Sequence, residues 1–313
     1  MTVEVLLLLG SLIVLAVAGD RFVIAITALS IAIRLRPVIV GALIGGLGTS
    51  IPELIVVPLA MGRGQPTLAL GTVAGSIVAN IALGLGLAAL VRPLRVDSTT
   101  VRREAPISTA AVVLFAITIV GGVSRFEGSL LAFAAGLSVA ASLRNAREAP
   151  PGDSLDAEVI AFAEDPRPRP SRHGIRALVA LGFMLAASEG VVRTATSIAV
   201  RIGWGEGLVG LTVVAVGTSA PLIASGIQAA RRGEDDVVVG NVLGGNLFIA
   251  LGGGALIGLI PHDPPGGIGA FAVIEMVLAA LVGWAFMARL GRVTRLEAVA
   301  LLVLYAAALP SLG

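Results

Sequence analysis

One internal repeat constrains this chain more than any other feature of its sequence. The hexapeptide GTSIPE at residues 48–53 recurs as GTSAPL at residues 217–222, a shift of 169 positions. The same shift then pairs glycine and apolar positions without a gap through Leu90. A repeat of this length predicts that two copies of one structural unit make up the fold. The copies differ at one chemically important position, because Glu53 of the first copy is Leu222 in the second.

The composition indicates that this chain folds in a membrane. Of its 313 residues, 56% are hydrophobic and 13% are charged, and the mean hydropathy is +0.97. A soluble domain carries about 25% charged residues. Cysteine is absent, which excludes disulfides and thiolate chemistry. The net charge of +2, without basic runs, gives no indication of a nucleic-acid partner. We therefore expect a lipid bilayer as the main solvent.

Ten apolar stretches are each near the roughly 20 residues that a helix needs to cross the hydrocarbon core. Residues 145–173 interrupt them with prolines and charged side chains, which indicates a polar linker. We predict an all-α polytopic membrane protein, with one five-helix repeat at 1–144, the linker at 145–173 and a second five-helix repeat at 174–313. The ten spans are expected at roughly 2–19 (with an extension to 34), 37–62, 68–91, 105–122, 127–144, 174–200, 206–230, 237–260, 267–288 and 294–311.

The arginines predict how the chain is oriented. If the N-terminus lies outside, seventeen arginines fall at inner ends and loops, whereas three (Arg63, Arg125 and Arg201) fall at outer ones. Inner loops carry such an excess of basic residues, so we expect a multi-pass protein of the plasma or inner membrane with a cytoplasmic linker at 145–173. Because five is an odd number, the second repeat is then inverted. Inverted repeats are typical of secondary transporters, which bind substrate near the midplane between the repeats.

Each copy of the hexapeptide supplies oxygen ligands in the middle of a span. Proline has no N–H, so Pro52 and Pro221 deprive the carbonyls of Gly48 and Gly217 of their helical partners. Such irregular backbone is tolerated at membrane depth only where protein covers it or where it lines a cavity. Carbonyl, hydroxyl and carboxylate oxygens suit hard cations such as Na⁺, Ca²⁺ or Mg²⁺. The hydroxyls beside the two breaks belong to Thr49, Ser50, Thr218 and Ser219.

Glu53 lies near the middle of its span, where a charged side chain costs about 2.5–3.5 kcal/mol. Such a residue is functional by default, and the alternative is a protonated glutamate in a structural hydrogen bond. On the next span, Ser76 and Asn80 are four residues apart and therefore share one helix face. Both can lie at the depth of Glu53 across a hairpin. The alternative for this pair is that it joins helices through an interface of small residues.

These motifs resemble those of the cation/calcium antiporter superfamily, which includes the sodium/calcium and calcium/proton exchangers. Its signature is a pair of inverted repeats, each with a G-T-S-x-P-E segment followed by a G-N-x-x-G-S-N segment. Both segments are recognisable within 48–80 and 217–249, and the resemblance covers nearly the whole chain. It implies ten helices, alternating access and a midplane cluster of cation sites, built from two glutamates, the Thr-Ser pairs and later Ser and Asn or Asp residues.

The resemblance carries over unevenly to the two copies. In the first copy, Ile77 replaces an asparagine. In the second copy, Leu222 replaces the glutamate and Ile249 occupies the position opposite Asn80. Gly226 and Gly245 replace serines. The matching residues are Thr49, Ser50, Glu53, Ser76 and Asn80 in the first copy, and Thr218, Ser219, Asn241 and Asn246 in the second.

The missing glutamate predicts which ion this chain binds. A Ca²⁺ site uses six to eight oxygens, and its affinity depends on the number of charged ligands. One carboxylate balances one monovalent ion or one proton. Asp235 and Asp236 cannot replace the lost acid, because they precede Ile249 by about 20 Å of helix. We therefore expect Na⁺ or H⁺ rather than Ca²⁺, or weak Ca²⁺ binding, and no covalent cofactor.

Other ionisable residues also fall within or near the spans. Asp20 and Glu189 are related by the same shift of 169, and each has an arginine within four residues. We interpret them as members of surface ion pairs in preference to a proton relay or a gate. Glu275 either faces the bundle or reaches for the interface. His262 is expected in a loop.

The leading hypothesis is a secondary active antiporter that exchanges cations (Na⁺, H⁺ or Ca²⁺) by alternating access. The alternative is a non-transporting or regulatory membrane protein on the same scaffold. A channel would need a continuous polar path, which Leu222 and Ile249 interrupt. The spans show no paired acids, histidine cluster or nucleophile elbow, so we expect no enzyme, and the oligomeric state stays open. The predicted cation site consists of Glu53, Thr49, Ser50, Gly48, Ser76, Asn80, Thr218, Ser219 and Gly217.

Overall fold

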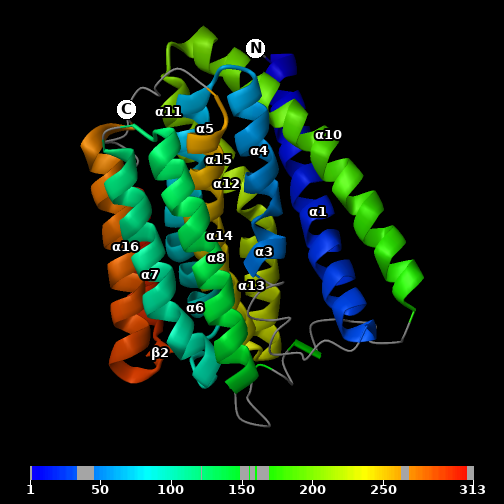
Figure 1. Cartoon of the computed structure of the whole chain (residues 1–313), viewed down its shortest axis with the longest axis vertical. Coiled ribbons are helices and arrows are strands. Elements are labelled where there is room, and N and C mark those ends of the chain that lie inside the picture. Colours follow the sequence, from blue (N-terminus) through cyan, green and yellow to red (C-terminus); the bar gives the residue numbers. More distant parts are fainter. Residues whose placement is uncertain are drawn as a thin grey trace.

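The computed structural model describes residues 2–33, 46–120, 122–148, 155, 159–160, 169–261 and 268–308, and these residues form a helical protein with one short pair of strands (Figure 1). The predicted loop residue His262 lies outside the described residues, as do most of the linker and the first part of the span expected at 37–62.

The first half of the chain begins with a long helix, α1, which continues through the extension that the sequence allowed. The next helix is broken at Ser50, at the repeated hexapeptide. The elements of this half are α1 (Thr2–Ala32), α3 (Gly46–Thr49), α4 (Ile51–Gly62), α5 (Pro66–Ala79), the π-helical turn η2 (Asn80–Leu85), α6 (Gly86–Val91), β1 (Leu94–Arg95), α7 (Thr99–Ile119) and α8 (Arg125–Glu148).

The second half repeats the order of the long helices, but its strand comes one helix later, after α16. Its elements are α10 (Pro170–Ile202), α11 (Glu206–Val209), the π-helical turn η3 (Gly210–Val214), α12 (Ala215–Thr218), α13 (Ala220–Arg232), α14 (Asp235–Phe248), the π-helical turn η4 (Ile249–Gly253), α15 (Gly254–Leu259), α16 (Gly269–Leu290), β2 (Arg292–Val293) and α17 (Arg295–Ala308). The shift of 169 places Asn80 on Ile249, so η2 and η4 begin at equivalent positions of the two halves.

The helices account for the ten predicted spans. Six are long and apolar enough to cross a membrane, and a seventh span is the pair Glu206–Thr218 and Ala220–Arg232, which is bent by 42° at its break. The other three segments of the described chain are α3 with α4, α7, and α17. These three are less apolar or shorter than the others: α4 and α17 are short, and α7 begins with charged residues. The helix ends differ from the expected linker, since α8 continues to Glu148 and α10 begins at Pro170.

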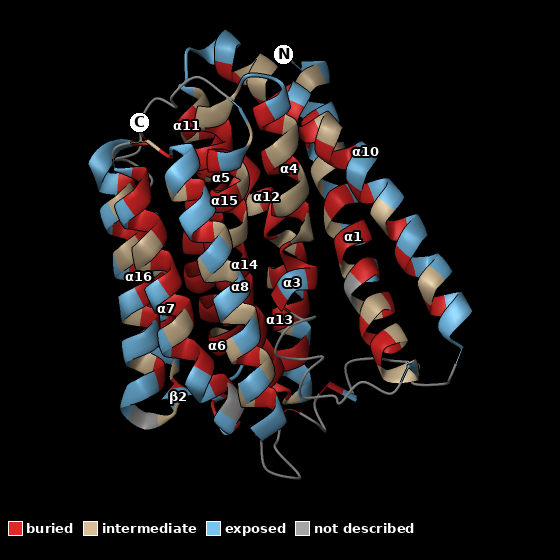
Figure 2. Cartoon of the chain, viewed as in Figure 1, coloured by how far each residue is buried: buried red, intermediate tan, exposed pale blue. Residues whose placement is uncertain are grey.

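The helices form a compact bundle with a two-helix arm at one edge. α1 and α10 run antiparallel side by side and pack mainly against each other (Figure 1). Buried side chains concentrate inside the bundle around α5 and α14, whereas the arm and α8 are largely exposed (Figure 2). The exposed positions carry large apolar side chains such as Leu6, Phe133 and Leu178, which is the pattern of a surface that faces lipid.

A polar clasp joins the loops at one end of the bundle. β1 pairs antiparallel with β2, which ties the segment after α6 to the segment after α16. Asp236 accepts hydrogen bonds from the backbone of Asp97 at 3.1 Å and Ser98 at 2.9 Å. Asp235 accepts one from the backbone of Arg95 at 3.1 Å. The two aspartates therefore hold the N-terminus of α14 against the start of α7, far from the hexapeptides, as their position in the sequence predicts.

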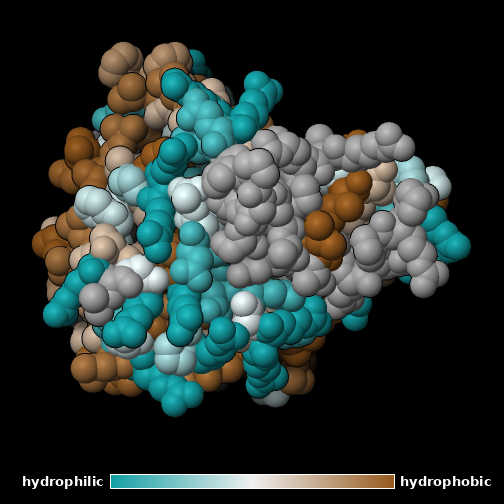
Figure 3. All heavy atoms as spheres, turned by 90° about the horizontal axis from the view of Figure 1, so that it is seen from below, coloured by the Kyte–Doolittle hydropathy of each residue, from teal (hydrophilic) through white to brown (hydrophobic). Residues whose placement is uncertain are grey.

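Hydrophilic side chains cover the end of the molecule that carries this clasp (Figure 3). Arg92 pairs with Asp235 and Arg103 with Glu148 at this end. The opposite end carries arginines that the sequence places outside: Arg63, which pairs with Glu189, and Arg201, which pairs with Glu4. The two predicted sets of arginines are thus separated along the helix axes. Which end faces the cytoplasm stays a prediction from the excess of basic residues.

Candidate functional site

The two proline breaks meet at the first helix. Gly19 of α1 lies between Pro52 and Pro221, and a Cβ atom at Gly19 would stand 2.7 Å from the Pro221 ring and 3.5 Å from the Pro52 ring. A side chain at this position would separate α1 from one break or both. The glycine therefore permits α1 to close over the point where the two repeats come together.

Glu53 is the acidic group of this meeting point. Proline at the second position of α4 places the glutamate in the first turn, directly after the break. The side chain is 1% exposed. The hydroxyl of Ser219, from the second repeat, donates to Oε1 at 3.2 Å, while Oε2 has no hydrogen-bond partner among the described residues. A buried carboxylate oxygen without a donor is a strong position for a cation or a proton.

The other predicted hydroxyls surround the same point and are all buried. The Ser76 and Thr218 hydroxyls lie 3.3 Å apart and so join the two repeats. Thr49 donates to the Gly46 carbonyl at 3.2 Å. Ser50 donates to the Gly46 carbonyl at 2.8 Å and has the Gly245 carbonyl within 3.2 Å. Each hydroxyl keeps its oxygen lone pairs, so each can also turn toward a cation.

Asn80 faces an asparagine that was not in the predicted site. Its amide nitrogen donates to Oδ1 of Asn246 at 3.0 Å, and both side chains are buried. The Asn80 Oδ1 atom has no hydrogen-bond partner among the described residues. The shift of 169 makes Asn246 equivalent to Ile77 and not to Asn80. The two repeats therefore each contribute one asparagine to this contact, but from positions that are not equivalent. The match of Asn246 to the exchanger motif was the sequence signal that could have placed it here.

One detail of the breaks differs from the prediction. The sequence predicted that the carbonyls of Gly48 and Gly217 lose their partners. At the end of α12, however, the Gly217 carbonyl accepts a backbone N–H of the helix cap. The helix compensates for the proline by tightening its last turn. A carbonyl oxygen has two lone pairs, so this bond leaves one lone pair for a cation.

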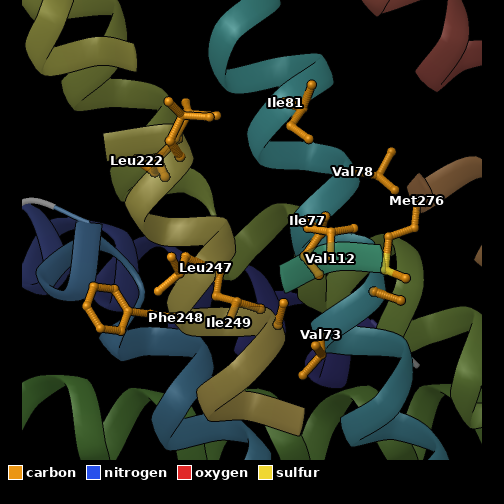
Figure 4. Close-up of a cluster of buried hydrophobic side chains, with 14 of the residues drawn as sticks. Val73, Ile77, Val78, Ile81, Val112, Leu222, Leu247, Phe248, Ile249 and Met276 are labelled. Atoms are coloured by element: carbon orange, nitrogen blue, oxygen red, sulfur yellow. The ribbon is translucent and has the colours of Figure 1, made fainter. Parts of the chain in front are cut away.

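An apolar wall stands where the second repeat lost its ligands. Leu222 is 2% exposed, and its side chain fills the space beside Gly84 and Gly245. A Cβ atom added to Gly84 would stand 2.7 Å from the Leu222 side chain, and one added to Gly245 would stand 3.2 Å from it. Figure 4 shows Leu222, Ile77 and Ile249 in one cluster of buried apolar side chains from α13, α5 and η4. Three positions that depart from the exchanger motif, Ile77, Leu222 and Ile249, therefore have apolar surroundings.

Glu189 and Glu275 do not join this site. The ion pair expected between Asp20 and Arg21 is not found, since Arg21 forms no ion pair with a described residue. Glu189 pairs with Arg193 at 2.7 Å and with Arg63, as the ion-pair interpretation predicts. Glu275 is 6% exposed and lies within electrostatic range of Tyr305 on α17, so it faces the bundle.

Glu104 of α7 is a buried acid that sequence reasoning missed. It is 3% exposed, and neither carboxylate oxygen has a hydrogen-bond partner among the described residues, although Ser142 of α8 lies nearby. Its place in the sequence beside Arg102 and Arg103 makes it look like part of a solvated helix end.

Comparisons with known proteins show which family has this architecture. The profile of the sodium/calcium exchanger protein family matches residues 3–144 and 175–310. The inner membrane protein YrbG of Escherichia coli (strain K12) is 39% identical over 82% of this chain and 81% of YrbG. The sodium/calcium exchanger MaX1 of Methanosarcina acetivorans is 25% identical over 98% of this chain and 97% of MaX1.

A solved structure matches over the full length. The sodium-calcium exchanger NCX_Mj, soaked with Na⁺, superimposes with a TM-score of 0.73 at 25% identity over 100% of both chains. NCX_Mj has also been solved after soaks that contained Ca²⁺ or Sr²⁺. This match confirms the predicted all-α fold of ten helices in two inverted repeats, in a multi-pass membrane protein that is a transporter and not an enzyme. The chain belongs to the sodium/calcium exchanger protein family and is a cation antiporter of that family.

Proposed function

We propose that this antiporter exchanges a monovalent cation, Na⁺ or H⁺, at a midplane site centred on Glu53. The observation that carries the proposal is the buried Glu53 carboxylate, which accepts a hydrogen bond from Ser219. The second glutamate of the exchanger motif is replaced by Leu222, which is buried beside Gly84 and Gly245. The ligands of the proposed site are Glu53, Thr49, Ser50, Ser76, Asn80, Thr218 and Ser219, with the carbonyls of Gly48 and Gly217.

Charge balance favours a monovalent ion. One Na⁺ or one proton neutralises Glu53, whereas Ca²⁺ would leave one positive charge near the bilayer centre. An unbalanced charge at that depth costs about 2.5–3.5 kcal/mol on insertion scales, which corresponds to roughly 100-fold in affinity. Asn80 and the hydroxyls supply dipoles but no second charge. Competition between Na⁺ and H⁺ for one carboxylate would be enough to couple their opposite movements.

The arm gives a physical route to alternating access. Gly19 of α1 covers the point where the two breaks meet, and α10 packs beside α4. The arm packs mainly on itself, while the clasp of β1 and β2 ties together the loops of the bundle. Sliding of α1 and α10 along the bundle would therefore uncover the site from one end and then from the other, with the ligands held in place.

Purified full-length protein in liposomes tests the proposal. We expect a Na⁺ gradient to drive proton movement, read with a pH-sensitive dye, and little uptake of radioactive Ca²⁺. Leu222→Glu restores a second carboxylate in a space of similar size and should raise Ca²⁺ affinity about 100-fold, whereas the neutral isostere Leu222→Gln should not. Micromolar Ca²⁺ affinity in the unmodified protein would contradict the monovalent preference.

A second candidate is the regulatory membrane protein that does not transport. The loss of ligands from the second repeat, with Leu222 and Ile249 in an apolar cluster, favours it. It predicts no ion movement under any gradient, and no effect of Glu53→Gln on any measured flux. The liposome experiment separates this candidate from the antiporter directly.

A further inference from the structure

A groove runs along the arm, on the surface that α1 and α10 share. It has a volume of about 930 Å³, and its described lining comes from these two helices alone. Apolar residues such as Val14, Val17 and Phe183 make up most of the lining, and Arg21 and Arg176 are its arginines. Neither guanidinium forms an ion pair or hydrogen bond with a described residue. The groove thus combines a long apolar floor with two arginines that have no counter-charge among the described residues.

The register of the arm brings the two arginines together. Ser197 donates to Glu4 at 2.6 Å, and Gly190 lies against Ser11. Continued along the antiparallel pair, this register sets Arg21 opposite Ala180 and Arg176 opposite Ala25. The two guanidiniums then belong to neighbouring turns, separated by about 6 Å along the helix axes. Two arginines at this spacing can hold one phosphate between them, because a guanidinium binds phosphate oxygens through parallel N–H groups.

The depth of the arginines matches the headgroup boundary of a bilayer. α10 has 33 residues and is about 50 Å long, whereas the hydrocarbon core is about 30 Å thick, so each end of the helix projects by roughly 10 Å. Arg176 lies six residues from the start of α10, about 9 Å along the axis. Arg21 lies about one turn deeper. The apolar part of the groove continues from Arg21 toward Ile13, eight residues or about 12 Å along the helix, in the direction that an acyl chain takes.

We propose that this groove binds one anionic phospholipid from the adjoining leaflet, with the phosphate between Arg21 and Arg176 and an acyl chain along Val14, Val17 and Phe183. Charge complementarity selects this occupant. Basic pockets between helices at the cytoplasmic side of membranes recognise anionic headgroups, and the excess of arginines predicts that this end is cytoplasmic. A neutral lipid could fill the apolar floor but would leave two positive charges near the hydrocarbon without a partner.

Native mass spectrometry of the purified full-length protein tests the proposal. The protein is mixed with equal amounts of phosphatidylglycerol and phosphatidylcholine, and the retained lipid is measured. A basic residue near the surface changes anionic-lipid binding by about fivefold, so the double variant Arg21→Gln/Arg176→Gln should lose about 25-fold in phosphatidylglycerol retention. Arg172→Gln is the matched control, because Arg172 is an exposed arginine in the first turn of the same helix and does not line the groove. It should retain phosphatidylglycerol within about twofold of the unmodified protein, since its charge lies outside the groove.

Two further measurements identify the occupant. Val17→Trp changes no charge but fills the apolar floor at an exposed position, and it should reduce retention of the lipid. Excess inorganic phosphate should not displace the lipid, because phosphate lacks the acyl chain.

The proposal is overturned if the unmodified protein retains both lipids equally, if the double variant matches the Arg172→Gln control, or if inorganic phosphate displaces the lipid. If the double variant does not fold, Arg176→Gln alone should show a loss of about fivefold, and no loss would count against the proposal. These readouts measure lipid, so they do not depend on whether the protein transports Na⁺ or H⁺.

Discussion

The Ser219 hydroxyl donates a hydrogen bond to Oε1 of Glu53 at 3.2 Å, and this contact joins the second repeat to the carboxylate of the first. Ser219 lies directly before α13, and Glu53 lies in the first turn of α4. Each therefore sits at the proline break of its own repeat. A displacement of either break would change the surroundings of the carboxylate, which is how movement of the repeats would alter ion affinity.

Replacing Glu53 should abolish exchange. Glu53→Gln keeps the size of the side chain and removes its charge, so we expect the rate of Na⁺-driven proton movement in liposomes to fall at least about 100-fold, in line with the cost of a charge at this depth. Glu104→Gln is the matched control, because Glu104 is equally buried but lies on α7 outside the site. It should leave the rate within about twofold. Equal loss in both variants would show that the assay reports general damage to buried acids.

Ser219→Ala should weaken ion binding without stopping exchange. A hydrogen bond to a charged group contributes about 1.5–3 kcal/mol, so we expect the apparent Na⁺ affinity to fall roughly tenfold or more, with a smaller change in maximal rate. Ser225→Ala is the control, because Ser225 lies in α13 and its only hydrogen bond to a described residue goes to the nearby Leu222 carbonyl at 3.1 Å. An unchanged Na⁺ affinity in Ser219→Ala would remove this serine from the site.

Gly19→Ala should destabilise the fold through the two prolines. The added Cβ would stand 2.7 Å from the Pro221 ring, and overpacking of this kind costs about 1–3 kcal/mol. Thermal unfolding of the purified protein should therefore show a lower midpoint. Gly10→Ala is the control, since a Cβ at Gly10 of the same helix meets nothing within 4 Å. If both variants unfold at the same temperature, the close contact of α1 with the breaks is wrong.

Asp236→Ala should loosen the clasp at the end of the bundle. Asp236 is 1% exposed and accepts backbone hydrogen bonds from Asp97 and Ser98. The Ser98 N–H is buried, and leaving it without an acceptor costs about 1–3 kcal/mol. We expect a fall in the unfolding midpoint and faster amide hydrogen exchange at the start of α7. Asp97→Asn changes an exposed side chain in the same loop and should have little effect. No difference between the variants would show that the clasp does not contribute to stability.

The architecture could be predicted from the sequence, because the internal repeat and the long apolar stretches are strong signals. Proline in the middle of an apolar run predicted both breaks, and the structure brings Glu53, Ser76, Thr218 and Ser219 into contact as expected. Whether these residues bind an ion stays a prediction.

Three features could not be predicted, because each depends on contacts between segments distant in the chain. Asn80 meets Asn246 across a register that the repeat does not suggest. Glu104 is buried with Ser142 of the distant helix α8 nearby, whereas its neighbours in sequence, Arg102 and Arg103, suggest a solvated helix end. The backbone N–H groups from which Asp235 and Asp236 accept hydrogen bonds belong to the other half of the chain. Periodicity describes one helix at a time, so it does not show which helix faces cover one another.

The matching π-turns have a consequence for how the two halves diverged. η2 and η4 start at equivalent residues, Asn80 and Ile249, although one is a polar amide and the other an aliphatic side chain. An extra residue in a helical turn is uncommon, and its presence at the same place in both copies indicates that the ancestral unit already had it before duplication. The second copy keeps the widened turn with an isoleucine where the first has an asparagine, so the turn does not depend on a polar side chain that could bind an ion.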